Sequence, residues 1–149
     1  MHDALSAVET AMVAIRRSQT RRALARSGPT GGVDPAVFDV VDAVEGLGDR
    51  ATVMAVAAAL DVAQPRASKL VAAAVEAGWL RREADQADGR RSLLVRTAAG
   101  LALSERVHAA RRARFAAATA GWPPADLDRF AQLLTRFVAG LTETAADRH

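Results

Sequence analysis

The sequence of 149 residues contains no cysteine, and aromatic residues make up only 4% of it. Without cysteine the chain has no disulfide, no cysteine-ligated zinc and no thiol for redox sensing or nucleophilic catalysis. No apolar run approaches the roughly 20 residues of a membrane-spanning helix, and the start of the chain lacks the layout of a signal peptide. We therefore expect a cytoplasmic protein.

Histidine is also scarce, and two of the three histidines, His2 and His149, stand at the ends of the sequence. With His108 as the third, the sequence has no metal-ligand spacing and no Ser-His-Asp arrangement. It also has no glycine-rich phosphate loop after a predicted strand. We expect no enzyme, no cofactor and no metal site, and a small hydrolase is the least favoured class.

Lysine is nearly absent too: of the 20 basic residues only Lys69 is not arginine. Arginine suits nucleic acid because its fork fits phosphates and guanine edges, although a GC-rich genome explains at least half of the bias. The charge changes sign along the chain. Residues 33–62 carry six acidic residues and one basic residue, whereas residues 64–96 carry seven basic and four acidic residues. The cationic segment is therefore the candidate for binding an anionic partner.

Apolar periodicity and breaking residues predict a mainly α chain with one β-hairpin. Helix caps are expected at Asp34, Thr52 and Thr97, and Gly78 should end a helix. A polar turn over residues 84–91 should join two strands into a hairpin with a charged tip. The expected helices cover residues 3–27, 34–46, 53–60, 64–77, 98–120 and 124–144, and the expected strands cover residues 79–83 and 92–96.

The order of helix, turn, helix and basic hairpin is that of a winged helix-turn-helix, whose second helix enters the major groove of DNA. The predicted helix 64–77 has two faces: Ala67, Leu70, Val71 and Ala74 share an apolar side, and Lys69 points the other way. Arg66 and Lys69 are its two cations in the first turns, and two cations on a surface helix usually mean only a solvated face. Their place in the first turns, where the charge changes sign, favours a DNA-reading role.

Three stretches of the chain resemble the MarR family of bacterial transcriptional regulators: residues 60–71, 76–82 and 88–100. They are similar to that family's recognition helix, its second strand and its wing with the junction to the next helix, in the same order and spacing. The resemblance implies a two-fold dimer built from the first and last helices, with a winged domain in each subunit and often a small-molecule site where these regions meet. The recognition-helix residues that it implies at bases and phosphates are Gln64, Pro65, Arg66, Ser68 and Lys69.

In the wing, the resemblance implies that Arg90 enters the minor groove and that Arg91 contacts a backbone phosphate. Asp88 stands two residues before Arg90, close enough for a fork-type hydrogen bond to its guanidinium. From the spacing alone, an ordinary charged turn is an equally good interpretation. Two residues depart from the family pattern. Trp79 replaces a smaller aliphatic residue, and Arg96 replaces a leucine, which casts doubt on how tightly the hairpin packs unless Arg96 reaches solvent or an acid.

The first and last helices carry apolar stripes that a small winged domain alone does not cover. We expect them to form a homodimer interface, with packing inside one chain as the alternative. The expected interface residues are Leu5, Val8 and Met12 in the first helix and Leu127, Phe130, Leu134, Phe137 and Leu141 in the last. The predicted regions are a dimerisation helix with its loop (1–32), the winged domain (33–100) and C-terminal dimerisation helices (101–149).

Arginine also clusters late in the first helix, where a solvated face is the commoner meaning. The cluster consists of Arg16, Arg17, Arg21, Arg22 and Arg26.

These features predict a regulator, more often a repressor, that binds a pseudo-palindromic operator in double-stranded DNA as a homodimer. A small aromatic or anionic effector is expected to release or modulate it, with unknown ligand-binding residues. The alternative is a winged-helix module that binds proteins and not DNA.

Overall fold

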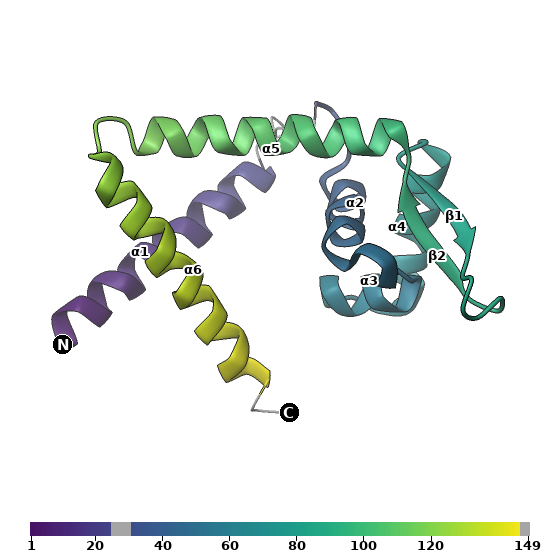
Figure 1. Ribbon diagram of the computed structural model, residues 1–149, viewed down its shortest axis with the longest axis horizontal. Helices are drawn as coiled ribbons and strands as arrows, with labels where there is room; N and C mark the ends of the chain where they lie inside the picture. Colours follow the sequence, from purple (N-terminus) through teal and green to yellow (C-terminus); the bar gives the residue numbers. More distant parts are fainter. Residues whose placement is uncertain (25–30, 147–149) are drawn as a thin grey trace. The chain divides into compact units, whose positions relative to one another are not determined.

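A computed structural model describes residues 1–24 and 31–146 of the chain, which is mostly helical with one two-stranded hairpin (Figure 1). The predicted fold class is confirmed. The chain divides into two compact units, residues 1–110 and 111–149. The predicted borders after residues 32 and 100 stay predictions. In chain order the elements are α1 (His2–Leu24), α2 (Pro35–Leu47), the 3₁₀ helix η1 (Gly48–Arg50), α3 (Val53–Leu60), α4 (Gln64–Glu76), β1 (Leu80–Ala84), β2 (Ser92–Arg96), α5 (Ala98–Ala118) and α6 (Pro124–Ala146).

Three helices begin at the caps that the sequence predicts. The carboxylate of Asp34 accepts from Ala36 N at 2.8 Å, and the hydroxyl of Thr52 accepts from Ala55 N at 3.1 Å, before α2 and α3 respectively. The hydroxyl of Thr97 accepts from Gly100 N at 3.1 Å at the start of α5. Each cap satisfies an N–H that has no partner inside the helix, so local sequence fixes these three starting points.

The core of the first unit lies where α2, α3 and α4 pack against each other and against the hairpin. Its side chains are mostly valine and alanine, and small side chains let the helices approach closely. Phe38 of α2 and two residues of α5, Leu103 and Val107, form a second buried cluster. Trp79 packs against both clusters, so the large residue at this position fills the space between them.

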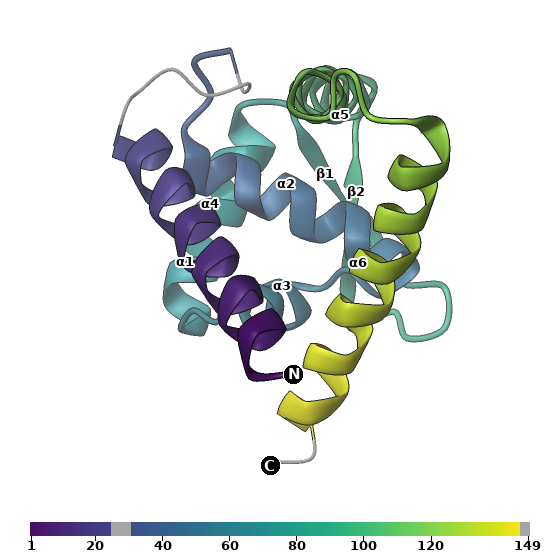
Figure 2. The ribbon, with the colours of Figure 1, turned by 90° about the vertical axis from the view of Figure 1, so that its left-hand side faces the viewer.

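The two strands lie side by side and antiparallel, with Leu80 opposite Arg96 and Ala84 opposite Ser92 (Figure 2). The first strand begins one residue later than predicted, because the backbone N–H of Trp79 donates to Ala74 O of α4 at 3.0 Å and not to the opposite strand. Leu94 N donates to Ala51 O at 2.7 Å and thereby fastens β2 to the segment between η1 and α3. The hairpin is thus attached to the helical core at its middle and at its base.

Glycine at position 100 is required by the approach of α5 to the end of α4. A Cβ atom built on Gly100 would lie 2.1 Å from the carbonyl oxygen of Trp79. The hydroxyl of Thr97 also donates to Gly78 O at 2.5 Å. The start of α5 and the turn before β1 are therefore in direct backbone contact.

The terminal helices α1 and α6 form as predicted, but their apolar stripes stay on the surface. The expected interface residues of α1 are 39–65% exposed, and those of α6 are 36–52% exposed. In the second unit, the rings of Trp122 and Phe130 pack edge to face at 5.5 Å. The first helix ends at Leu24 in the described part of the chain, so the predicted end at Ser27, Arg26 of the arginine cluster and most of the glycine-proline break lie outside the described residues.

Candidate nucleic-acid interface

Helix α4 separates a buried apolar face from an exposed polar one, as its sequence predicts. Ala67, Val71 and Ala74 are fully buried in the core, and Leu70 is half-buried beside them. The exposed residues in the first turns are Gln64, Pro65, Arg66, Ser68 and Lys69. Because the buried face fixes the rotation of α4 about its axis, these side chains all point away from the core.

The start of α4 has no side-chain cap, in contrast to α2, α3 and α5. The preceding residue, Ala63, lacks a side-chain oxygen, and Pro65 stands in the first turn. Ala67 N donates to Ala63 O, while the N–H groups before it have no partner within the helix. Unpartnered N–H groups and the positive end of the helix dipole favour an anion at this end of α4.

The wing, which we define as residues 85–91 between the two strands, is a hydrogen-bonded turn. Asp85 N donates to Arg91 O at 3.1 Å, and Arg91 N donates to Asp88 O at 3.0 Å. The carboxylate of Asp88 accepts from the backbone N–H of Arg90 at 3.1 Å. The structure thus differs from the predicted fork: Asp88 orders the backbone of the turn at Arg90, and its contact is not with the guanidinium.

The cations of α4 and of the wing are available to an outside partner. Arg66, Lys69, Arg90 and Arg91 are all exposed. None of the four forms an ion pair with any residue in the part of the chain that the structure describes. The two cationic groups therefore offer their full charge to a ligand such as a phosphate backbone.

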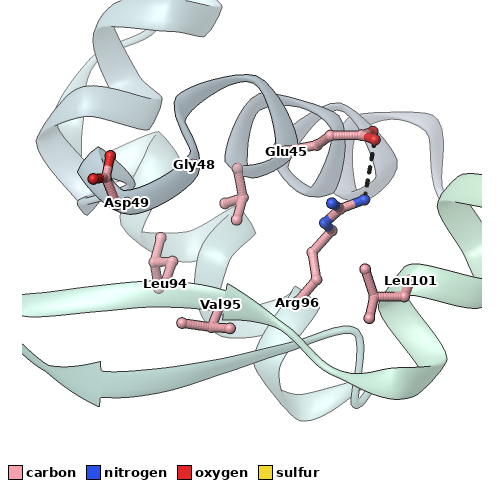
Figure 3. A pocket seen from close by; sticks show the side chains of 8 residues that line it. Glu45, Gly48, Asp49, Leu94, Val95, Arg96 and Leu101 are labelled. Atoms are coloured by element: carbon pink, nitrogen blue, oxygen red, sulfur yellow. Dashed lines mark ion pairs between the residues drawn. The ribbon is translucent and has the colours of Figure 1, made fainter.

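Arg96, which departs from the family pattern, does reach an acid. Its guanidinium lies 3.2 Å from the carboxylate of Glu45 in α2 (Figure 3). His108 of α5 lies on the same carboxylate, with its Nε2 3.0 Å from each oxygen. Burial raises the pKa of the Glu45 carboxyl, but the hydrogen bond from His108 and the positive charges of Arg96 and His108 outweigh it. The pKa of Glu45 therefore lies below its ordinary value of 4.5.

Glu45 and His108 are functional candidates that the sequence analysis did not single out. The only sequence signal for this contact is the arginine at position 96, where an aliphatic residue is expected. A partly buried charge needs an opposite charge nearby, but the partner lies 51 residues away in sequence and no local pattern identifies it. The contact removes the doubt about packing, because Arg96 joins the base of the hairpin to α2.

An open cavity of about 370 Å³ lies beside this ion pair, with walls from α2, η1, β2 and α5. Glu45 and Arg96 stand at one end and Asp49 at the other (Figure 3). Leu94, Val95 and other apolar side chains complete the lining.

Among the described residues, no three histidine, aspartate or glutamate side chains gather as metal ligands would, and none of the helices is long and apolar enough to cross a membrane.

Helices α3 and α4 with the hairpin form a winged helix-turn-helix. Residues 31–91 match the model of the MarR family, so the predicted resemblance to this family is confirmed. No curated protein sequence matches the chain significantly.

Solved structures, two of which are described as MarR family proteins, share this fold over most of the chain. A MarR family protein from Bacillus stearothermophilus is 17% identical, with 93% of each chain covered and a TM-score of 0.73. A second MarR family transcription regulator is 22% identical, with 96% of this chain and 97% of that chain covered and a TM-score of 0.69. A MepR variant from S. aureus bound to an oligodeoxyribonucleotide is 16% identical, with 87% and 97% covered and a TM-score of 0.59. The chain thus has the fold of MarR family transcription regulators.

Proposed function

We propose that the protein is a transcriptional regulator that binds a specific sequence of double-stranded DNA as a homodimer. This proposal rests on the exposed, unpaired cations of α4 and of the wing, because α4 and the hairpin that bears the wing both bury apolar residues in one core. A rigid support matters because groups that read DNA must be held in a defined geometry. A related fold, that of the MepR variant, has been solved with an oligodeoxyribonucleotide.

In this proposal α4 lies in the major groove and the wing contacts the neighbouring minor groove. The exposed side chains of the first turns of α4 read base edges, and its uncapped N-terminus approaches a phosphate. Arg90 enters the minor groove, where a narrow A·T-rich segment has an enhanced negative potential. Asp88 supports Arg90 through the backbone of the turn, and Arg91 contacts a phosphate.

The apolar stripes of α1 and α6 supply the dimer interface in this proposal. Exposed apolar patches of this kind mark sites of association. A two-fold dimer reads a pseudo-palindrome whose half-sites are about 10 bp apart, or a multiple of that spacing. In α1 the interface includes Leu5, Val8 and Met12, and in α6 it includes Leu127, Phe130, Leu134, Phe137 and Leu141.

The mode of regulation that we propose follows from the resemblance to the MarR family. We propose a non-enzymatic repressor that works on genomic DNA in the cytoplasm and is released by a small aromatic or anionic ligand. The ligand and the regulated genes are best found by selecting bound fragments from the native genome, starting upstream of the protein's own gene. Small aromatic acids are then screened for release of the bound fragment.

A duplex obtained by this genomic selection also tests which residues of α4 and of the wing contact DNA. Arg66→Ala and Arg90→Ala should each weaken binding by roughly 1–3 kcal/mol, the range for a good base contact. The matched control is Arg50→Ala, which removes an exposed arginine of η1 from the acidic part of the winged domain and should leave affinity unchanged. Unchanged affinity in both Arg66→Ala and Arg90→Ala would contradict the assignment.

Salt dependence separates this function from a protein-binding module. Binding to DNA through Z phosphates should weaken with salt along a log–log slope near −0.9Z, whereas protein docking depends far less on salt. A flat slope, with no duplex enriched from the genome, would favour the protein-binding alternative.

A further inference from the structure

The carboxylate of Glu45 connects three elements of the first unit. It belongs to α2, it pairs with Arg96 at the end of β2, and it bonds to His108 in α5. Figure 3 shows the Glu45 and Arg96 side chains reaching toward each other across the gap between α2 and β2. We call these three residues the Glu45 cluster.

The Glu45 cluster is partly shielded from water, unlike the other ion pair of the hairpin. Its side chains are 20–30% exposed, whereas those of Arg81 and Glu83, which pair within β1, are 49–55% exposed. Shielded charges interact more strongly than exposed ones, and exposed pairs contribute little. Removing one partner also leaves a charge in a partly buried place without compensation. The cluster can therefore hold a geometry that the Arg81–Glu83 pair cannot.

The position of the Glu45 cluster matters for the wing. Strand β2 is the return strand of the hairpin, and Thr97, which follows it directly, is held at the base of the hairpin by bonds to Gly78 O and Trp79 O. Along the strand itself, two further bonds reach the segments that precede the hairpin. Leu94 N bonds to Ala51 O near the middle of the strand, and Arg96 pairs with Glu45 at its last residue. With Leu94 and Thr97 held, the Arg96–Glu45 pair is the contact that ties the last residue of β2 to α2, and we expect its loss to let the strand turn about the remaining attachments. The wing lies at the far end of this strand, so a small rotation at the base displaces Arg90.

We propose that Glu45 is a positioning residue for DNA reading, which through Arg96 and His108 sets the direction of β2 and thereby aims Arg90 of the wing at the minor groove. This inference rests on the proposed function. It assigns to the arginine at position 96 a role that a leucine there does not supply. The Glu45 cluster touches no base itself and acts only through the strand.

The test compares two versions of the selected duplex that differ only in the base pairs facing the wing. A·T pairs there leave the minor groove without an amino group, whereas G·C pairs add the guanine N2 amino group. The affinity ratio of the two duplexes measures minor-groove reading by Arg90 and does not depend on the amount of folded protein. The variants are Glu45→Gln, Arg96→Leu and Arg90→Ala, and the matched control is Glu83→Gln, which breaks the exposed pair of β1.

The protein without substitutions should prefer the A·T duplex by roughly five- to tenfold, within the range of a good base contact. Glu45→Gln and Arg96→Leu should lose most of this preference, as Arg90→Ala does. The double variant Glu45→Gln/Arg90→Ala should lose no more than Arg90→Ala alone, because both changes remove the same contact. Glu83→Gln should keep the preference, and Arg96→Lys, which retains the charge, should restore much of it.

The outcomes separate the inference from the function on which it rests. If the protein without substitutions enriches no duplex, the proposed function fails and the inference fails with it. If the protein binds but Glu45→Gln and Arg96→Leu keep the full A·T preference, or the protein has no such preference, the inference is wrong and DNA binding stands. A lower melting temperature with an unchanged affinity ratio shows a merely structural role, and it also overturns the inference. If Glu45→Gln does not fold, Arg96→Leu decides, because it places an apolar side chain beside an apolar cavity wall.

Discussion

The winged region and the terminal helices contain similar apolar residues but bury them very differently. Val40, Val41 and Val71 in the winged region have no exposed surface, whereas Val138 and Leu141 of α6 are 53% and 52% exposed. One copy of the chain therefore completes the core of the winged region by itself. The stripes of α1 and α6 have the periodicity of core helices, but no comparable core covers them in the described part of the chain. The stripes of α1 and α6 are therefore the surfaces on which we propose that a second copy of the chain packs.

The largest effect is expected from a charge in the stripe of α6. Phe137→Asp should convert the dimer into a monomer, because an unpaired carboxylate in an apolar interface costs several kcal/mol. That cost corresponds to a dimer dissociation constant raised roughly hundredfold or more. Sedimentation equilibrium measures the change. The control is Met54→Asp in α3, which is 69% exposed and lies outside both stripes. A dimeric Phe137→Asp variant would show that the stripe of α6 is not the interface.

The second-largest effect is expected at Gly100, and it tests how the core of the winged region is packed. Gly100→Ala should destabilise the protein by about 1–3 kcal/mol, as overpacked sites do, because the new methyl group would meet the carbonyl of Trp79. Gly46→Ala is the matched control, since its Cβ would meet nothing within 4 Å and the helix should gain up to about 1 kcal/mol. Urea unfolding of both variants checks the two signs. Equal effects would mean that α5 does not abut Trp79 as described.

A smaller, pH-dependent effect is expected at Glu45. Its pKa is lower in the folded protein than the ordinary 4.5, so the folded state favours the ionised carboxylate. The resulting stabilisation is complete above about pH 4.5 and is lost as the pH falls through the lower folded value. Glu45→Gln removes this contribution. The difference in unfolding free energy between the two proteins should therefore shrink as the pH is lowered from 7 toward 3, and a difference that stays constant would contradict the shift.

The smallest effect is expected at Ser104 in α5. Its hydroxyl is buried and has no hydrogen-bond partner among the described residues. Ser104→Ala removes a polar group whose burial is uncompensated, so the variant should be as stable as the parent or more stable by up to about 1 kcal/mol. Calorimetry measures the shift in melting temperature. A clear loss of stability would show that the hydroxyl has a partner.

Much of the winged fold follows from local sequence signals. Asp34, Thr52 and Thr97 are caps whose side chains bond within three residues of themselves, so their effect does not depend on the rest of the fold. The two faces of α4 follow from helical periodicity alone. Lys69 lies on the exposed face as this periodicity predicts, whereas the assignment of Gln64, Pro65, Arg66 and Ser68 to a recognition helix follows from the family resemblance. Their contacts with DNA remain predictions.

Contacts between distant segments were harder to predict. The pairing of Glu45 with Arg96 and His108 depends on how α2, β2 and α5 pack, and the sequence marked only Arg96 as unusual. The turn at Asp88 shows a second limit. A carboxylate two residues before an arginine can bond either to the guanidinium or to the backbone N–H. Only the backbone geometry of the turn selects the N–H of Arg90. The short helix η1 was not predicted, since its three residues leave no periodic pattern.

Thr97 gives the hairpin one further property. Its hydroxyl and its backbone N–H bond to the carbonyls of Gly78 and Trp79, so both ends of the segment between them are tied together at one point. A chain segment whose ends are joined in this way can change in length without moving what lies on either side. Longer or shorter tips can therefore be exchanged between Glu83 and Ser92 while α4 and α5 stay in place, and such a change would alter the minor-groove contact that we propose for Arg90.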